Sequence, residues 1–220
     1  MTLANKGVLV SDFDGTITRF DFYDLICREF PSIARDYWQQ YEAGQITHFE
    51  ALRLIFAGIR TSEPKLFQIV ESMQICSQIK PCVTSLRQVG WDVVVASAGC
   101  DWYIKRLLDA QGVSITVHAN PGIFSPETGL IVRFPEPSVF FSQELGVNKV
   151  AVVREAIKTG GRVAFAGDGR PDLAPALLVP PNRRFAKSWL AKKLHEIGEK
   201  FRPFDDWSEV AHTLVKESAL

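Results

Sequence analysis

The chain has 220 residues, of which 46% are hydrophobic and 23% are charged. These fractions are typical of globular proteins, so the disordered and low-complexity classes are excluded. Lys plus Arg number 25 and Asp plus Glu number 25, so the formal net charge is zero. This balance gives no global electrostatic reason to expect a nucleic acid or an anionic membrane as a partner.

The four cysteines form no CxxC pair, which argues against a zinc site and a disulfide framework. The first residues lack the apolar run of a signal peptide, and no stretch reaches about 18 consecutive apolar residues. We therefore expect a cytoplasmic protein that neither binds nor spans a membrane. The oligomeric state is not predicted by the sequence.

Short apolar runs alternate along the chain with longer amphipathic segments. The expected strands are Gly7–Ser11, 91–96, 114–117 and 162–166. The expected helices between them are 80–89, Asp101–Ala110 and 148–158. This alternation is typical of βαβ units, so we expect an α/β fold with a Rossmann-like parallel sheet and helices on both faces.

One long interval between the first two strands breaks the alternation. Residues 18–80 contain aromatic-rich helical segments and no convincing strand. About 60 residues exceed what a single crossover helix needs, so we expect an inserted helical cap over the carboxyl edge of the sheet. Residues 18–80 are called the cap below, and 1–17 with 81–220 are expected to form the catalytic core.

Two further features follow the third strand. The segment 119–137 carries Pro-Glu-Thr-Gly between apolar runs and predicts a β-hairpin. From Phe185 onward, the pattern predicts a helix, a loop and a second helix.

Two pairs of aspartates directly follow expected strands. Asp12 and Asp14 follow the first strand, Gly15 permits a tight turn after them, and Asp168 and Asp172 follow the strand at 162–166. Open α/β sheets bind ligands at the carboxyl ends of their strands. Paired carboxylates near a phosphate require a cation, and Mg²⁺ suits such oxygen ligands best.

A hydroxyl and an ammonium complete the pattern. Ser97, Ala98 and Gly99 follow the second strand and offer a hydroxyl and backbone N–H groups at a helix start, which suits a phosphate. Lys149 begins a helix 19 residues before Asp168 and supplies positive charge. An acidic strand end alone has an ordinary structural explanation, but the conjunction of all these elements predicts a phosphate-handling site.

These elements resemble the four motifs of the haloacid dehalogenase superfamily of phosphatases. The matching residues are Asp12 and Asp14, Ser97, Lys149, and Asp168 with Asp172. The place of the cap resembles the type-1 (C1) cap of the phosphoserine-phosphatase-like branch. Within that branch, DFDGTIT, SAGCDWYIKRLL and the tail RFAKSWL…FRPFDDWSEV are similar to the methionine-salvage phosphatases that act on 2-hydroxy-3-keto-5-methylthiopentenyl-1-phosphate.

The resemblance implies a Mg²⁺-dependent phosphatase with two catalytic carboxylates. Asp12 would attack phosphorus and become an aspartyl-phosphate. Asp14 would protonate the leaving alkoxide and then act as base toward the hydrolytic water. Asp12, the backbone carbonyl of Asp14 and Asp168 would bind the metal.

The resemblance also implies residues that bind the phosphoryl group or support the site. Ser97, the backbone of Ala98 and Lys149 would hold the phosphoryl oxygens. Asp172 would orient Lys149 or a water of the metal. Thr16 and Gly99 would shape their loops, and Thr16 would help to place the general acid.

Two departures bear on the substrate. Phosphoserine phosphatases carry a Glu nine residues after the nucleophile and a cap Arg for the substrate carboxylate, where this chain has Asp21 and Phe56. A phenyl ring cannot pair with a carboxylate, so phosphoserine is disfavoured unless Arg53 or Arg60 takes that place. Asp21 and Phe22 are expected to face the cleft. The segment before Lys149, PSVFFSQELGVN, lacks the cysteines of the methionine-salvage enzymes.

We therefore expect hydrolysis of a small, partly apolar phosphomonoester, either the methionine-salvage compound or a related metabolite. Phosphoserine hydrolysis and phosphoryl transfer to a second alcohol remain alternatives. A binding or regulatory protein on a silent phosphatase fold is the non-enzymatic alternative, and the presence of all the motif residues speaks against it.

Other polar and aromatic residues have ordinary interpretations. The histidines show no metal-ligand spacing and are expected to be packing or surface residues; they are His48, His118, His195 and His212. The cap aromatics are interpreted first as its core, with an apolar substrate pocket as the alternative; they are Phe20, Phe22, Tyr23, Tyr37, Trp38 and Phe56.

Overall fold

Apolar side chains on both sides of β1 (Gly7–Ser11) make it the central strand of a sheet. In the computed structural model, which describes residues 6–159 and 161–218, β1 pairs in parallel with β2 (Trp91–Cys100) and β8 (Arg162–Gly167). Leu9 packs into the hydrophobic cluster on one face and Val10 into the cluster on the other. Strand β1 is therefore covered on both faces, as parallel strands usually are.

The sheet has six strands in the order β10-β9-β8-β1-β2-β3, and every pairing in it is parallel. Its remaining strands are β3 (Thr116–Asn120), β9 (Arg184–Ala186) and β10 (Arg202–Pro203). The expected α/β fold is confirmed. The expectation of helix from Phe185 onward is wrong at its start, because Phe185 and Ala186 are buried in β9 beside β8.

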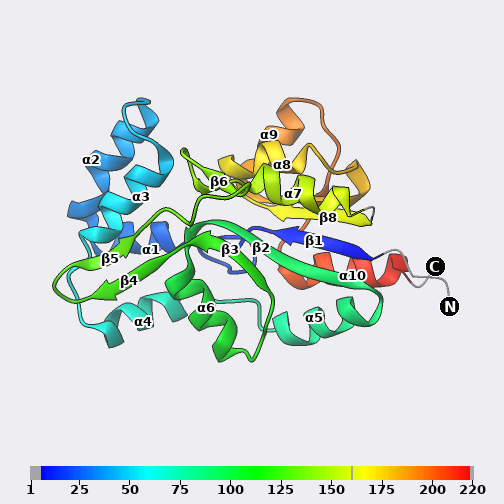
Figure 1. Ribbon diagram of the computed structural model, residues 1–220, viewed down its shortest axis with the longest axis horizontal. Helices are drawn as coiled ribbons and strands as arrows, with labels where there is room; N and C mark the ends of the chain where they lie inside the picture. Colours follow the sequence, from blue (N-terminus) through cyan, green and yellow to red (C-terminus); the bar gives the residue numbers. More distant parts are fainter. Residues whose placement is uncertain (1–5, 160, 219–220) are drawn as a thin grey trace.

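Helices cover both faces of this sheet (Figure 1). One face carries α5 (Ile79–Gln88), α6 (Asp101–Ala110) and α10 (Trp207–Ser218). The other carries α7 (Lys149–Lys158), α8 (Leu173–Ala176) and α9 (Ser188–Glu196), with short 3₁₀ turns at Arg170–Asp172 and Pro181–Arg183. Across the two described ranges, no helix has both the length and the apolar character needed to cross a membrane.

The cap contains four helices, which lie together at one end of the sheet (Figure 1). They are α1 (Phe22–Glu29), α2 (Pro31–Glu42), α3 (His48–Ala57) and α4 (Glu63–Glu71). Side chains of Asp21, Thr47 and Ser62 accept the first free N–H groups of α1, α3 and α4 and so define where these helices begin.

The two connections between the cap and the sheet lie side by side. Thr18 forms an antiparallel bridge with Ile75, and the Cys76 N–H donates to the Ile17 carbonyl at 2.9 Å. These contacts join the chain where it leaves the sheet to the chain where it returns. The boundaries of the two units at 17/18 and 80/81 stay a prediction.

Two hairpins extend from the core toward the cap. The hairpin expected within 119–137 is confirmed as β4 (Gly122–Ser125) and β5 (Gly129–Val132), and a shorter one joins β6 (Phe141–Ser142) to β7 (Gly146–Val147). Gly129 has φ +76°, and a Cβ there would lie 2.6 Å from the Ala57 carbonyl of α3. The absence of a side chain at Gly129 thus lets β5 pack directly on the cap.

Candidate active site

The carboxyl end of β1 places Asp12 and Asp14. The Asp12 N–H donates to the Ala166 carbonyl at 2.9 Å and so extends the pairing with β8 by one residue. The chain then turns at Gly15, where φ is +67°. A Cβ at Gly15 would lie 2.6 Å from an oxygen of Asp168, so this glycine serves both the turn and the close approach of the Asp168 carboxylate.

Lys149 links two of the carboxylates. Its Nζ lies 2.8 Å from Asp12 Oδ1 and 2.7 Å from Asp172 Oδ1, and the lysine is buried. It is the first residue of α7, whose start is defined by the Asn148 side chain accepting the Ala151 N–H at 3.0 Å. Burial acts to lower the pKa of Lys149, but the two carboxylates outweigh it, so the pKa is raised and the ammonium stays charged.

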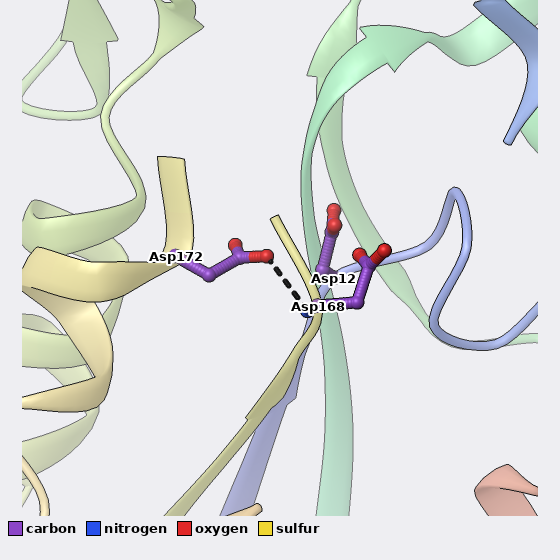
Figure 2. Close-up of side chains that lie close together, drawn as sticks. All are labelled: Asp12, Asp168 and Asp172. Carbon is purple, nitrogen blue, oxygen red and sulfur yellow. Dashed lines mark hydrogen bonds between the residues drawn. The ribbon is translucent and has the colours of Figure 1, made fainter. Parts of the chain in front are cut away.

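Asp172 is held by three donors. Its Oδ2 accepts the backbone N–H group of Asp168 at 3.0 Å (Figure 2). The same oxygen accepts the Gly169 N–H at 3.0 Å, and Oδ1 accepts from Lys149. These bonds fix Asp172 as a support for the turn after β8. Thr16, expected to help place Asp14, instead donates its hydroxyl to Asp168 Oδ1 at 3.0 Å.

Three carboxylates form a cluster of suitable size for a cation. Ligand oxygens of Asp12, Asp168 and Asp172 all lie within 4.8 Å of one another. Burial and then the charge of Asp172 raise the pKa of Asp12, and the same two causes raise that of Asp168 to about 7. A divalent cation would offset the repulsion among these carboxylates. Because such a cation prefers hard oxygen donors, the cluster fits the acidic metal site that the sequence motifs predict.

Ser97 connects the carboxyl end of β2 to Asp14. Its hydroxyl donates to Asp14 Oδ2 at 3.1 Å and accepts the Gly99 N–H at 2.9 Å. A Cβ at Gly99 would clash with the Tyr103 hydroxyl and lie 2.6 Å from the Asp14 carboxylate. Glycine at this position therefore lets these oxygens converge.

The surroundings of Asp14 favour a proton-carrying carboxyl. Burial raises its pKa, whereas hydrogen bonding from Tyr103 and Ser97 acts to lower it. A carboxyl with a raised pKa holds a proton closer to neutral pH and can donate it to a leaving group. Tyr103 was not among the residues expected from the sequence.

A pocket of about 100 Å³ separates these groups from the cap. Its core wall includes Asp12, Asp14, Lys149 and Asp168, together with residues 97–99. Its cap wall consists of Asp21, Tyr23, Trp38, His48, Leu52 and Phe56. The polar and charged groups thus face a mostly apolar surface across the cavity.

The two cap residues expected at the cleft differ in position. Asp21 lines the pocket and accepts the Tyr23 N–H at 2.7 Å, and burial followed by Asp14 and Asp168 raises its pKa. Phe22 is fully buried and lies behind the wall, with ring centroids 5.1 Å from Phe56 and 4.4 Å from Tyr103.

Neither Arg53 nor Arg60, the two candidates to pair with a substrate carboxylate, lines the pocket. Arg53 lines a separate hollow beside β5 and lies 3.9 Å from Glu50. The Arg60 guanidinium donates to the carbonyls of Ala57 and Ile59. Of the side chains that the structure describes, only that of Lys149 brings a cation to the pocket wall.

His48 was expected to be a packing or surface residue, but it is buried and lines the pocket. A sequence signal for this position exists. His48, Leu52 and Phe56 are spaced by four residues in α3 and share one face, and all three line the cavity.

Comparisons with known proteins agree with this geometry. Residues 9–176 match the family model of the haloacid dehalogenase-like hydrolases. The chain is 22% identical over 209 residues to a 2-hydroxy-3-keto-5-methylthiopentenyl-1-phosphate phosphatase of Bacillus pumilus, covering 93% of this chain and 89% of the relative. It is 23% identical over 218 residues to the bifunctional enzyme MtnB/MtnX of Bacillus licheniformis, covering 95% of this chain but only 49% of that longer protein.

The fold has solved counterparts as well. A probable phosphoserine phosphatase from Vibrio cholerae superposes with a TM-score of 0.70 at 18% identity, covering 99% of this chain and 66% of that structure. The resemblance seen in the sequence motifs and the expected enzyme class, a phosphatase of this superfamily, are confirmed. Because the family model matches most of this chain, the chain belongs to the haloacid dehalogenase-like hydrolases.

Proposed function

We propose that the protein is a Mg²⁺-dependent phosphatase that hydrolyses a small phosphomonoester through an aspartyl-phosphate. The observation that carries the proposal is the position of Lys149 Nζ, 2.8 Å from Asp12, in a pocket that Asp14 also lines. Burial and the neighbouring carboxylates raise the pKa of Asp12, and the buried ammonium acts in the opposite direction, toward the anionic nucleophile. The ammonium also offers positive charge to phosphoryl oxygens. A nucleophile, a proton donor and an anion-binding group thus share one enclosed space.

The two carboxylates would divide the chemistry. An oxygen of Asp12 attacks phosphorus, the bond from phosphorus to the alcohol oxygen breaks, and Asp14 gives that oxygen a proton. In the second step, Asp14 takes a proton from the water that attacks phosphorus, and the Asp12 carboxylate is restored as inorganic phosphate leaves. Atoms and charges balance with water as the only second substrate.

Asp12, the backbone carbonyl of Asp14 and Asp168 would hold the metal. Bound Mg²⁺ would neutralise phosphoryl charge and lessen the repulsion among the carboxylates. Asp172 and Thr16 would position other groups. Asp172 accepts hydrogen bonds from Lys149 and from the turn after β8, and Thr16 donates to Asp168. The all-oxygen donor set supports Mg²⁺ as this metal.

The carboxyl end of β2 would bind the phosphoryl group together with Lys149. Ser97 and Ala98 belong to the last residues of this strand and line the pocket, and α6 begins directly after the strand at Asp101. The Ser97 hydroxyl and the Ala98 N–H would hold the phosphoryl group in line for attack, which accounts for much of the rate enhancement in such reactions.

For the substrate, we propose 2-hydroxy-3-keto-5-methylthiopentenyl-1-phosphate or a compound close to it. The names of several relatives at 22–24% identity support this choice. The rings of Tyr23, Trp38 and Phe56 support an apolar tail, and none of the described cap side chains that line the pocket brings a cation to pair with a carboxylate. Phosphoserine, which carries a carboxylate, therefore suits this cap poorly.

The test is phosphate release from that compound and from phosphoserine, with and without Mg²⁺, by wild type and Asp12→Asn. We expect metal-dependent release that favours the first compound and falls by about 10⁴-fold or more in the variant. Preference for phosphoserine would overturn the substrate, and transfer to added glycerol would indicate a phosphotransferase. Folded, Mg²⁺-supplied protein that releases phosphate from no compound of a broad panel would favour a binding protein.

A further inference from the structure

His48 has hydrogen-bonding capacity that the protein leaves unused. It is 9% exposed, lines the pocket, and its Nδ1 is buried with no hydrogen-bond partner among the described residues. The Trp38 and Tyr41 rings meet the imidazole edge to face, with centroids 5.8 and 5.3 Å away. Nε2 also has no hydrogen-bond partner among the described residues and, unlike Nδ1, is not fully enclosed, so it is the ring nitrogen available to a ligand in the pocket.

The burial of Nδ1 assigns the proton of the ring. A neutral imidazole has one N–H and one lone pair, and an orphaned buried N–H is rarer than an under-satisfied acceptor. The proton therefore belongs on Nε2. Because Nδ1 is closed off, the edge of the ring that lines the pocket is the distal one, which carries Nε2.

The imidazole is neutral under ordinary conditions. Burial lowers the pKa of His48 to about 4, the charge of Lys149 acts in the same direction, and that of Asp172 opposes it. A neutral N–H recognises a carbonyl or hydroxyl oxygen without demanding a negative charge. Leu52 and Phe56, which line the pocket on the same helix as His48, are apolar.

The position of His48 over the core is fixed by its backbone. The His48 N–H donates to Glu144 Oε1 at 3.1 Å, and the Phe49 N–H donates to the Glu144 carbonyl at 2.9 Å. Glu144 lies in the turn between β6 and β7, and this hairpin leads directly into α7 and Lys149. These hydrogen bonds therefore hold His48 at a fixed position relative to Lys149, which would face the phosphate.

We propose that His48 determines substrate specificity by donating its Nε2–H to a neutral carbonyl or hydroxyl oxygen on the alcohol part of the substrate. This proposal rests on the phosphatase function proposed above. It assigns to the substrate a phosphate at one end, an uncharged acceptor oxygen next to it, and an apolar remainder against the cap rings.

A matched pair of probes tests the contact in turnover. Pentyl phosphate and 2-oxopentyl phosphate differ by one carbonyl oxygen, and we expect kcat/KM of wild type to favour the second by about tenfold. His48→Phe should remove this preference, whereas His48→Gln, which keeps a donor, should restore part of it. Leu52→Ala, one turn further along the same face, should slow both compounds equally.

Binding to Asp12→Asn tests the same contact without turnover. With Mg²⁺ present, its Kd should be about tenfold lower for 2-oxopentyl phosphate, and the double variant Asp12→Asn/His48→Phe should bind both probes alike. Equal affinities in Asp12→Asn, binding of neither probe, or a preference that survives the double variant would overturn the proposal. If wild type releases phosphate from no compound of the broad panel while the binding preference depends on His48, the phosphatase proposal fails and the contact between His48 and the ligand stands.

Discussion

The two walls of the pocket are built in different ways. On the core wall, Asp12 and Asp168 follow parallel strands and Lys149 begins a helix, so residues far apart in the chain meet at one sheet edge. On the cap wall, His48 and Phe56 belong to a single helix and come from one stripe of α3. The core wall is charged and the cap wall is mostly apolar.

This difference separates chemistry from selectivity. Groups on the core wall control one another's ionisation. Lys149 pairs with Asp12 and Asp172, and burial together with the charge of Asp172 raises the pKa of Asp12. Residues on the cap wall contact the pocket independently. We expect substitutions on the core wall to lower kcat and stability, and substitutions on the cap wall to change KM and substrate preference.

Removing the cation should disrupt the core wall most strongly. Lys149→Met leaves Asp12 and Asp172 buried without their common partner, so we expect the free energy of unfolding to fall by about 3 kcal/mol and phosphatase activity to be lost. Urea unfolding measures the first effect. Lys158→Met changes an exposed lysine of the same helix and should cost less than about 0.5 kcal/mol. Equal losses in the two variants would contradict the assignment.

Metal binding provides a second test of the core wall. Mg²⁺ at about one hundred times its Kd should raise the free energy of unfolding of the wild type by about 2.7 kcal/mol, because only the folded state assembles the site. Asp168→Asn should abolish this increase, measured by thermal unfolding with and without Mg²⁺. Asp205→Asn, an exposed carboxylate outside the cluster, is the control and should retain it.

Reducing one ring should sharpen the contrast between the walls. Phe56→Leu keeps an apolar side chain but removes a ring that lines the pocket and packs on Phe22. We expect kcat/KM for an apolar phosphomonoester to fall by about tenfold, mainly through KM. Inhibition by vanadate, which mimics only the phosphoryl group, should stay within about twofold. A parallel loss of vanadate inhibition would show that the walls are coupled.

The smallest effect concerns pH and the cap wall. The pKa of His48 is lowered to about 4, whereas in the unfolded chain it returns to about 6.5. Between these values the unfolded state binds more protons, so stability decreases as the pH falls through this window. From pH 7.5 to 5.8, wild type should lose about 1 kcal/mol more than His48→Gln in urea unfolding. The prediction fails if the variant loses as much.

The core wall was predictable because its residues occupy recognisable points in the chain. Asp12, Ser97 and Asp168 follow apolar runs, and Lys149 starts an amphipathic segment, so the sheet edge that unites them followed from the order of elements alone. The sequence did not predict which of these residues contact one another. Thr16 was expected near Asp14 and contacts Asp168, because the turn at Gly15 brings the Asp168 carboxylate against this loop.

The cap wall was only partly predictable. The aromatic-rich pattern indicated helices, but which face of each helix lines the pocket depends on how the cap packs on the β4–β5 hairpin. His48 was therefore interpreted as packing, and Phe22 as a cleft residue although it is buried behind Phe56. Strands β9 and β10 were missed for a similar reason, since two or three residues show no period and β9 exists only beside β8.

Local patterns were enough to predict the parallel sheet, the helical insertion, the family and the groups that carry the chemistry. These patterns are apolar periodicity and motif residues placed at strand ends or helix starts. The packing of the cap on the core was needed to show which cap side chains meet those groups, that Arg53 and Arg60 lie elsewhere, and that His48 and Tyr103 join the site. A helix face acquires its role from what packs against it, and that partner lies elsewhere in the chain.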